Sequence, residues 1–447
     1  MHLPKVLIIN QPFNTNTGGG ITLSNLFARW DRDKLAVACS GYLLNAEMDP
    51  TLCNNYYQLG SKERKWIFPF NLFGRKYYSG PININDSVNN KDKVVVKKSK
   101  LRVKLIMDYM LPIFDYIGLS HFQAKTRLST EFCNWIDNFK PDILYIQSET
   151  REDILFGIEL CDFLKLPMVF HMMDDWPTSV GVKGPMKNFW KSKIDKEFRL
   201  LLDRADLLMG ISDYMAQEYK KRYGKKFVTF HNPINLDFWK KEQRDTYQLP
   251  QSPILLYAGR IGLGIDKSLK NIAEAIKKIN SGLHTDIKFM IQAQDKPIWT
   301  KNYENVEHRE FVRYEGLPAV FSEADFLILP YDFSVESLSY IRYSMPTKAP
   351  EYMASGTPII IFAPKDTALV QYAEKHNWAA VVTDNSIDVL AEKIKELFLD
   401  ESLREQIAKT AKNIAKKRHS SKLVGKEFQQ MILTVAEKNE NKKIATL

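Results

Sequence analysis

Short apolar runs alternate with longer segments of helical periodicity along most of the chain. In the first half, the apolar runs predict buried strands at about residues 6–9, 35–39, 143–146, 168–171, 207–211 and 227–230. The segments between them predict helices at about 22–30, 125–138, 152–163, 186–202 and 213–223. Strands that alternate with helices in this way are typical of parallel sheets with right-handed crossovers.

The same alternation begins again after a linker at about 232–252, which carries prolines and a cluster of charged residues. Strands of the second half are predicted at about 254–257, 287–291, 326–329, 359–362 and 379–382. The chain is therefore predicted to be an α/β protein with two Rossmann-like parallel-sheet domains, over residues 1–245 and 250–415. We also expect an irregular insertion at about 60–100 and a last helix over 416–447, long enough to cross back to the first domain.

Composition agrees with two globular domains. A chain of 447 residues, 45% hydrophobic and 26% charged, is long enough for each domain to bury its own core. The four cysteines show no CxxC pairing, so we expect reduced thiols and no zinc site. The N-terminus enters a strand-like run without a signal region, and no apolar stretch approaches the ~20 residues of a membrane-spanning helix. We expect a cytoplasmic protein that requires no metal or other cofactor.

The formal net charge of +10 is concentrated in one segment. Residues 91–104 carry seven basic side chains against Asp92 alone, and an apolar, aromatic stretch follows directly. One interpretation is that residues 91–114 contact an anionic membrane surface, so that the protein is peripheral on the inner face of the plasma membrane. The alternative is a solvated loop before a core helix. A nucleic-acid partner is not expected, because no helix-turn-helix, zinc-finger or RNP pattern accompanies the charge.

The segment 344–362 predicts a short helix followed by a buried strand. Ser344 or Thr347 can cap the start of the helix, Pro346 fits near its first turn, and Gly356 can end it in the left-handed conformation.

On this helix Lys348 and Glu351 share a face at the end where free backbone N–H groups point outward. The helix dipole and Lys348 together would stabilise an anion such as a diphosphate. A carboxylate one turn deeper can accept hydrogen bonds from two vicinal hydroxyls, as a ribose offers. The alternative is a capped surface helix on which the two side chains form a weak, exposed pair.

Two further constellations fit an anionic ligand. Arg260 follows a predicted strand and Lys267 opens the next helix, and two cations can neutralise a departing diphosphate without a metal. After the first strand, Gly18, Gly19 and Gly20 precede a helix expected to open at about residue 21. Glycines let a backbone approach a ligand closely, but this is not the GxGxxG dinucleotide pattern.

A polar segment ends one first-domain strand, where doubly wound sheets bind ligands. His171 can hydrogen-bond a sugar hydroxyl or serve as a structural core histidine, and both interpretations stay open. Asp174 or Asp175, with Trp176 beside them, can orient an acceptor. The two carboxylates are adjacent in sequence, which does not suit hydrolysis on opposite faces of one sugar.

These motifs resemble those of the family 4-type retaining glycosyltransferases, which have the GT-B architecture. The residues P-x-K-x-x-E-Y-x-x-x-G-x-P around Lys348 are similar to the donor-site signature, and Arg260 with Lys267 resembles the G-R-x(5–7)-K signature. The resemblance implies two Rossmann-like domains that face each other across a cleft. It also implies that Glu351 is the second Glu of the E-x(7)-E motif and holds the nucleotide ribose. The first Glu would fall at Tyr343, so the chain departs from the motif there.

The resemblance further implies transfer of a sugar from a nucleotide-diphosphate sugar, with retention, to a carbohydrate or lipid-linked acceptor. Such an acceptor would belong to bacterial surface polysaccharide or glycolipid assembly. The resemblance also implies that Arg260, Lys267 and His171 take part in catalysis and that the Asp174–Trp176 turn lies on the acceptor side. The donor site implied by the resemblance comprises Gly18, Gly19, Gly20, Arg313, Ser344, Pro346, Thr347, Lys348 and Glu351.

Two other functions stay open on the sequence. A sugar-nucleotide epimerase or a sugar-phosphate synthase shares the GT-B architecture. A nucleotide-sugar-binding subunit that has lost catalysis would explain Tyr343 at the position of the missing Glu.

Overall fold

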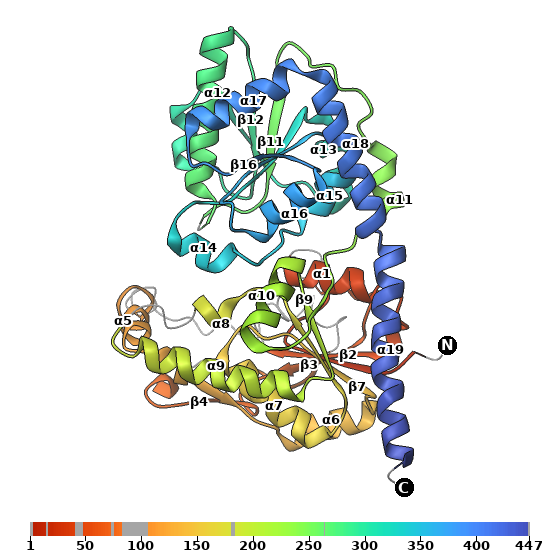
Figure 1. Ribbon diagram of the computed structural model, residues 1–447. Helices are drawn as coiled ribbons and strands as arrows, with labels where there is room; N and C mark the ends of the chain where they lie inside the picture. Colours follow the sequence, from red (N-terminus) through yellow and green to blue (C-terminus); the bar gives the residue numbers. More distant parts are fainter. Residues whose placement is uncertain are drawn as a thin grey trace. The chain divides into compact units, whose positions relative to one another are not determined.

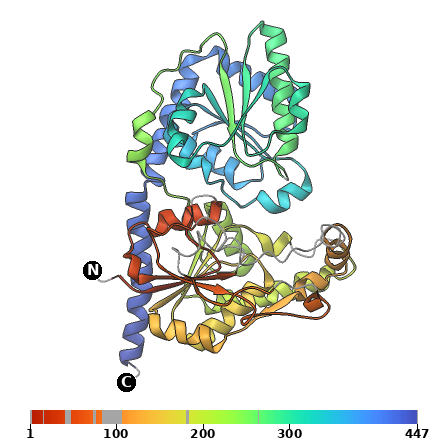
Figure 2. The same ribbon diagram turned by 180° about the vertical axis from the view of Figure 1, so that it is seen from behind.

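The chain forms two compact units in the computed structural model, each built around a parallel sheet (Figures 1 and 2). The structure describes residues 3–14, 17–40, 48–72, 76–82, 106–179, 184–262 and 264–445. The first unit comprises Met1–Ile211, Ala216–Phe230 and Glu427–Leu447, and the second comprises Ser212–Met215 and His231–Lys426.

The first unit contains an eight-stranded sheet in the order β10-β9-β8-β7-β1-β2-β3-β5. Its neighbouring strands pair in parallel, except for the antiparallel pair of β3 and β5. The strands are β1 (Val6–Ile9), β2 (Leu35–Ser40), β3 (Asn55–Leu59), β5 (Gly80–Ile82), β7 (Ile143–Ile146), β8 (Met168–Met172), β9 (Leu207–Gly210) and β10 (Val228–Thr229).

Helices cover both faces of this sheet, and the central strands β1, β7 and β8 are buried throughout. Burial on both faces explains why these strands are continuous apolar runs. A second small sheet pairs β4 (Arg64–Trp66) with β6 (Ala124–Thr126). The helices are α1 (Gly18–Phe27), α5 (Leu111–Tyr116), α6 (Thr130–Phe139), α7 (Arg151–Leu164), α8 (Trp176–Ser179), α9 (Lys187–Arg204) and α10 (Asp213–Tyr223).

The second unit contains a six-stranded, fully parallel sheet in the order β13-β12-β11-β14-β15-β16. Its strands are β11 (Ile254–Ala258), β12 (Lys288–Gln292), β13 (Val306–Arg309), β14 (Phe326–Pro330), β15 (Ile359–Phe362) and β16 (Ala380–Val382). Its helices are α11 (Leu236–Trp239), α12 (Asp266–Leu283), α13 (Leu317–Glu323), α14 (Val335–Ile341), α15 (Lys348–Ser355), α16 (Ala368–His376), α17 (Ile387–Leu399) and α18 (Glu401–Arg418).

The last helix, α19 (Ser421–Ala445), returns the chain to the first unit, with which residues from Glu427 onward are grouped. There the ring of Phe428 packs against Phe27, Tyr145 and Phe230, at centroid distances of 5.0, 6.2 and 5.3 Å. The first unit is therefore assembled from both ends of the chain.

The predicted α/β class with two Rossmann-like domains is confirmed. The strands expected at 6–9, 143–146 and 359–362 form at those residues. Strands β3 and β13 escaped prediction because polar residues interrupt their apolar pattern, and β5 because it has only three residues, two of them Gly and Pro. Helix α1 begins at Gly18, within the glycine run and before the expected start.

One boundary and one segment differ from the sequence prediction. The first unit gives way to the second after Phe230, before residue 245, because the following segment is tied to the second unit by the ion pair of Arg244 with Asp325 at 2.6 Å. The segment expected to be irregular contains strands β4 and β5 in its described part. The basic run Lys91–Lys104 lies outside the described residues. No helix among the described residues has the length and apolarity needed to span a membrane.

Candidate active site

The strand order of the second sheet reverses between β11 and β14, its two central strands. In doubly wound sheets a ligand binds at such a reversal, beyond the carboxyl ends of the strands. The loop after β11 carries Arg260, and Asp332 follows β14. The second unit therefore offers its binding position between these two loops.

Arg260 lies in the loop after β11, and Lys267 lies in the first turn of α12, to which this loop leads. Both side chains are exposed, and neither forms an ion pair with another residue that the structure describes. Asp332 fixes the end of the loop, since its backbone N–H donates to the carbonyl of Gly264 at 2.8 Å and its Oδ1 accepts from the N–H of Ser268 at 2.8 Å. Gly264 has a φ of +88°, a conformation that favours glycine. Two unpaired cations thus stand at the carboxyl end of β11.

Helix α15 is buried along its whole length except at Lys348, so the surface-helix alternative is wrong. Gly356 ends the helix with a φ of +81°, as predicted. Thr347 occupies the N-cap position but its side chain makes no capping hydrogen bond. The Ser344 hydroxyl points back to the carbonyl of Tyr340 at 3.4 Å. Side-chain capping by Thr347 is therefore wrong. In the first turn the N–H of Ala349 donates to the carbonyl of Pro346 at 3.0 Å and Pro350 has no N–H, so this turn offers few free N–H groups to a ligand.

Glu351 is a buried carboxylate, and few interactions with the protein offset the cost of its burial. Its side chain is 3% exposed, and its ion-pair partner among the described residues is the Nζ of Lys348, at a loose 4.0 Å. No described residue donates a hydrogen bond to it. Burial raises the pKa of Glu351, and Lys348 opposes that shift more weakly. A buried carboxylate of this kind gains most from a ligand that brings hydrogen-bond donors.

Aromatic contacts hold α15 against the rest of the unit. The backbone N–H of Ala258, at the end of β11, donates to the Tyr352 hydroxyl at 3.0 Å. The Tyr352 ring meets Phe321 edge to face at 4.9 Å, and Lys348 Nζ lies 5.9 Å from the centre of the Phe321 ring. The helix that carries Lys348 and Glu351 is thereby joined to the strand that precedes Arg260.

The other donor-side residues flank this region. Pro346 precedes α15 in the turn that α14 leads into, and the Thr347 carbonyl accepts from Asn232 Nδ2 at 3.1 Å. Arg313 is exposed, follows β13, and makes no ion pair with another described residue. Tyr343, at the position of the missing Glu, lies with its ring 5.4 Å from that of Tyr214.

In the first unit, the three glycines form the first turn of α1. Thr17 caps this helix, since its hydroxyl accepts from the N–H of Gly20 at 3.2 Å. A Cβ added to Gly19 would lie 2.6 Å from Gln11 Oε1, and one added to Gly20 would lie 2.3 Å from the Asn14 side chain. A side chain at either position would displace that of Gln11 or Asn14, so packing favours glycine there, whether or not a ligand also approaches.

His171 is fully buried in β8. Its Nδ1 pairs with the Tyr145 hydroxyl at 2.5 Å, and its Nε2 has no hydrogen-bond partner among the described residues. Burial lowers the pKa of His171 to about 3, so the ring is neutral. These surroundings fit a core histidine, and the described contacts give no support to direct contact with a substrate.

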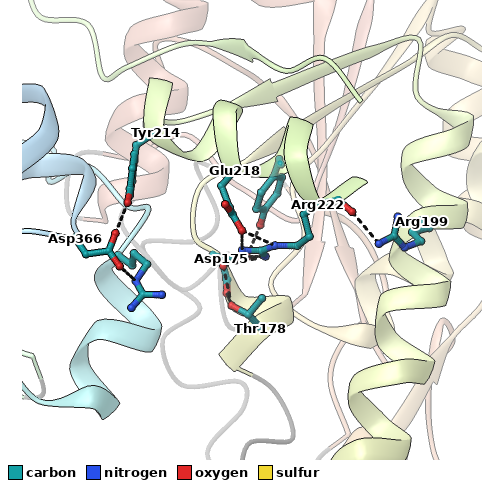
Figure 3. A network of polar contacts seen from close by, with 9 residues as sticks. Asp175, Thr178, Arg199, Tyr214, Glu218, Arg222 and Asp366 are labelled. Atoms are coloured by element: carbon teal, nitrogen blue, oxygen red, sulfur yellow. Dashed lines mark hydrogen bonds and ion pairs between the residues drawn. The ribbon is translucent and has the colours of Figure 1, made fainter. Parts of the chain in front are cut away.

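Asp175 lies in an internal polar network (Figure 3). Its carboxylate accepts from Arg222 Nη1 at 2.9 and 3.1 Å, from the Tyr219 hydroxyl at 2.7 Å and from the Thr178 hydroxyl at 2.7 Å. Glu218 adds a second carboxylate to Arg222 at 3.2 Å. Asp175 is 3% exposed, and both oxygens of its carboxylate accept hydrogen bonds from other side chains. This fits a structural role.

The neighbours of Asp175 differ from each other. The Trp176 indole donates to the carbonyl of Ser148 at 2.6 Å and is buried, so it anchors the turn. Asp174 is half-buried and close enough to raise the pKa of Glu149, for which burial is the larger cause. Of the three residues expected on the acceptor side, Asp174 is the one that retains solvent exposure.

The sequence analysis missed a polar group at the carboxyl ends of β1 and β7. The strand order of the first sheet reverses between these strands, and Gln11, Gln147 and Ser148 follow them as buried polar residues. The Gln147 amide lies near Tyr145, yet its Nε2 has no hydrogen-bond partner among the described residues. In the sequence, this group could have been found from the polar residues that directly follow two apolar strands.

A metal site is not evident in the part of the chain that the structure describes. No group of three or more His, Cys, Asp or Glu side chains is arranged there to hold a metal ion. The four cysteines are free thiols.

Comparisons with known proteins agree with the fold. The family model of the glycosyl transferases group 1 matches residues 240–414, and that of Glycosyltransferase Family 4 matches residues 107–238. A search of curated protein sequences finds no match.

Solved structures match over nearly the whole chain. Sucrose-phosphate synthase from Thermosynechococcus elongatus is 12% identical with a TM-score of 0.58, covering 96% of this chain and 98% of that protein. HepE from Anabaena in complex with UDP is 12% identical with a TM-score of 0.57, covering 96% and 100%. A glycosyltransferase from Rickettsia africae is 12% identical with a TM-score of 0.58, covering 97% and 98%. From the family matches and this shared fold, the chain belongs to the group 1 glycosyltransferases of the GT-B fold.

Proposed function

We propose that this glycosyltransferase moves a sugar from a nucleotide-diphosphate sugar to a carbohydrate acceptor with retention at the anomeric carbon. The observation that carries the proposal is Glu351, a buried carboxylate that has no hydrogen-bond donor among the described residues and lies in the first turn of α15. A ribose brings two adjacent hydroxyl donors to such a carboxylate. The complexes of HepE with UDP and with UDP-glucose make UDP-sugars the first donors to test.

The diphosphate would lie between the start of α15 and the loop after β11. Arg260 and Lys267 are exposed cations without a described ion-pair partner, and Lys348 stands at the start of the helix. Positive groups fixed where negative charge develops stabilise the leaving diphosphate most. Arg313 would lie near the nucleobase, and Ser344, Pro346 and Thr347 would shape the turn that presents α15.

In the proposed reaction, the bond from the anomeric carbon to the diphosphate oxygen breaks while a bond from the acceptor oxygen forms on the same face. The acceptor proton passes to the departing phosphate, so no protein base is needed. Because cations of the chain neutralise the leaving group, we propose that the reaction requires no metal. The rate should then be unchanged by EDTA.

The first unit would bind the acceptor through Asp174, a half-buried carboxylate. Gly18, Gly19 and Gly20 would be further ligand contacts of that unit. We propose that this acceptor is a lipid-linked saccharide of surface polysaccharide or glycolipid assembly. The basic run Lys91–Lys104 supports a membrane-bound substrate, because polybasic segments bind anionic lipid surfaces.

A donor screen followed by a product assay tests the function. Thermal shift against a panel of nucleotide sugars identifies the donor, because a saturating ligand that binds the folded state raises its stability. NMR of the product made with a lipid-linked acceptor pool then gives the anomeric configuration. Formation of the opposite anomer would exclude retention, and turnover of the donor without any acceptor would favour an epimerase.

Tyr343 supports one competing function. The missing Glu at this position would fit a nucleotide-sugar-binding subunit without catalysis. Donor binding with no release of nucleoside diphosphate in the presence of the acceptor pool would favour that subunit.

A further inference from the structure

The segment 106–116 forms a short helical run that presents apolar side chains on two sides. It comprises a turn of π-helix, Ile106–Met110, and then α5. No residue of α5 is buried, although its sequence is Leu-Pro-Ile-Phe-Asp-Tyr. An apolar helix of a water-soluble domain ordinarily buries such residues. This segment therefore exposes more apolar surface than a helix of this composition ordinarily does.

One side of the run packs on the first unit. The Phe114 ring contacts Phe70 at 5.1 Å, with the planes nearly perpendicular. The other side carries Tyr109, Ile113 and Tyr116, each about one helical turn from the next. They are 67%, 58% and 59% exposed. All three side chains are thus largely open to solvent.

Two adjoining segments extend this surface. Residues 67–70 are held next to it, because the N–H of Ile67 donates to the carbonyl of Gln123 at 3.0 Å, and Phe68 there is 74% exposed. The start of α9 adjoins it as well, since Phe122 packs on Trp190 at 4.6 Å. Figure 1 shows α5 at the edge of the first unit beside this end of α9. We define the apolar patch by its exposed members Ile67, Phe68, Tyr109, Ile113, Tyr116 and Phe189.

Unpaired lysines lie on the same segments as the apolar patch. On the segments 64–72, 106–127 and 184–191, the acidic residues are Asp108 and Asp115. The exposed lysines of these segments, none in an ion pair with another described residue, are Lys65, Lys125, Lys187 and Lys191. The basic run Lys91–Lys104 also leads directly into the segment in sequence. Exposed aromatic and aliphatic side chains with lysines on the same segments complement the acyl boundary and the anionic headgroups of a bilayer.

We propose that the apolar patch inserts into the interface of an anionic lipid bilayer while the lysines of the same segments contact its headgroups. A second copy of the chain is a poorer occupant, because two such patches would bring like charges together around the contact. The inference rests on the proposed function only in that a lipid-linked acceptor would be reached from this surface. It extends that proposal by naming the side chains that enter the lipid.

Vesicle binding of the full chain tests the inference. Wild-type protein should cosediment with vesicles of equimolar phosphatidylglycerol and phosphatidylcholine and much less with pure phosphatidylcholine. The variant Phe68→Ser/Tyr109→Ser/Ile113→Ser/Tyr116→Ser should partition at least about tenfold less into the anionic vesicles. Because these side chains are exposed, the variant should keep the wild-type melting temperature and nucleotide-sugar binding.

Two matched variants separate the apolar and the electrostatic contributions to vesicle binding. Phe163→Ser/Leu200→Ser removes exposed apolar residues of the same unit outside the apolar patch and should bind vesicles as the wild type does. Lys65→Gln/Lys125→Gln/Lys187→Gln/Lys191→Gln should weaken binding mainly at low salt, since screening removes surface electrostatics.

Insertion itself has a direct readout. Compared with the wild type, which has eight tryptophans, the Tyr109→Trp variant should gain fluorescence that shifts to the blue on anionic vesicles and is quenched by lipids brominated on the acyl chain. Equal partitioning of the serine variant and the wild type would overturn the inference. So would a concentration-dependent dimer that the serine variant abolishes without lipid, which would assign the apolar patch to a second copy. None of these outcomes depends on turnover, so a failure of the proposed enzymatic function would be recognised separately.

Discussion

Burial decides the chemistry of individual side chains in this protein. Glu351 and Asp175 are both carboxylates that are 3% exposed. Asp175 accepts hydrogen bonds from three side chains, whereas Glu351 has the loose contact with Lys348. The first is a satisfied structural group, and the second is available to a ligand that donates hydrogen bonds. Residue type and exposure alone do not distinguish them.

Replacing Glu351 by Gln tests its role. The change should weaken binding of UDP, even without a sugar, by about 1.5–3 kcal/mol, because a charge-assisted bond to the ribose becomes a neutral one. Calorimetry measures this as a Kd about 10–100-fold higher. Glu392→Gln, on the exposed face of α17, is the matched control and should bind UDP as the wild type does. Unchanged affinity of the Glu351 variant would remove the ribose contact from the proposal.

Arg260, in the loop before α12, and Lys267, in the first turn of α12, can be tested in the same way. Arg260→Ala and Lys267→Ala should each lower the rate of nucleoside diphosphate release by about 10²-fold, with little change in melting temperature. Lys277→Ala, at an exposed position of the same helix, should leave the rate unchanged. If the Arg260 and Lys267 variants both turned over like the wild type, the diphosphate would have to bind elsewhere.

At the scale of elements, close contacts at glycine residues constrain the start of helix α1 and the end of helix α15. The turn Gly18–Gly20 is packed against Gln11 and Asn14, and Gly356 lets the chain turn from α15 into β15. An added Cβ at Gly356 would lie 2.6 Å from the Arg244 carbonyl, in a left-handed backbone conformation. Helix α15 is thus held at its end by the segment that leads into the second unit.

The Gly356→Ala variant should lower the free energy of unfolding of the second unit by about 1–3 kcal/mol, through the strained φ and the backbone clash. Gly282→Ala is a matched control, because the added Cβ in helix α12 meets nothing within 4 Å. That change should leave stability unchanged or raise it by up to about 1 kcal/mol. Urea unfolding followed by circular dichroism measures both. Equal stability of the two variants would show that the contact with Arg244 relaxes easily.

At the scale of the whole molecule, both units bury neutral histidines. Burial lowers the pKa of His171 in the first unit and of His231 in the second to about 3. The pKa of His419, whose ring lies 5.2 Å from that of His231, is also well below its ordinary value, chiefly through burial. Above the ordinary histidine pKa of about 6.5, folded and unfolded chains are both neutral at these sites and the stability is complete.

Below pH 6.5 the unfolded chain takes up protons that the folded chain does not, so stability should fall with pH. The loss is about 1.4 kcal/mol per pH unit for each such histidine, until its folded pKa is reached. Unfolding by urea between pH 7.5 and 5 measures the slope. His171→Gln removes one titrating group and should flatten the slope by about that amount. A slope unaffected by this substitution would mean that His171 is not held neutral by the fold.

The sequence by itself determined the α/β class, the two sheets and the membership of Lys348 and Glu351 in one short helix. Apolar runs and helical periodicity are local properties, and the central strands are continuous apolar runs because helices cover both faces of each sheet. Gly356 was likewise predictable, because its left-handed conformation is a local requirement.

Only the tertiary structure decided which polar residues are free. Arg260 follows a buried strand and is exposed and unpaired among the described residues, whereas Arg222, in the last turn of α10, is bound to Asp175. The burial of α15 and of His171, and the apolar patch left on α5, depend in the same way on elements distant in sequence. Packing partners and desolvation arise from contacts between such elements, so no local pattern encodes them.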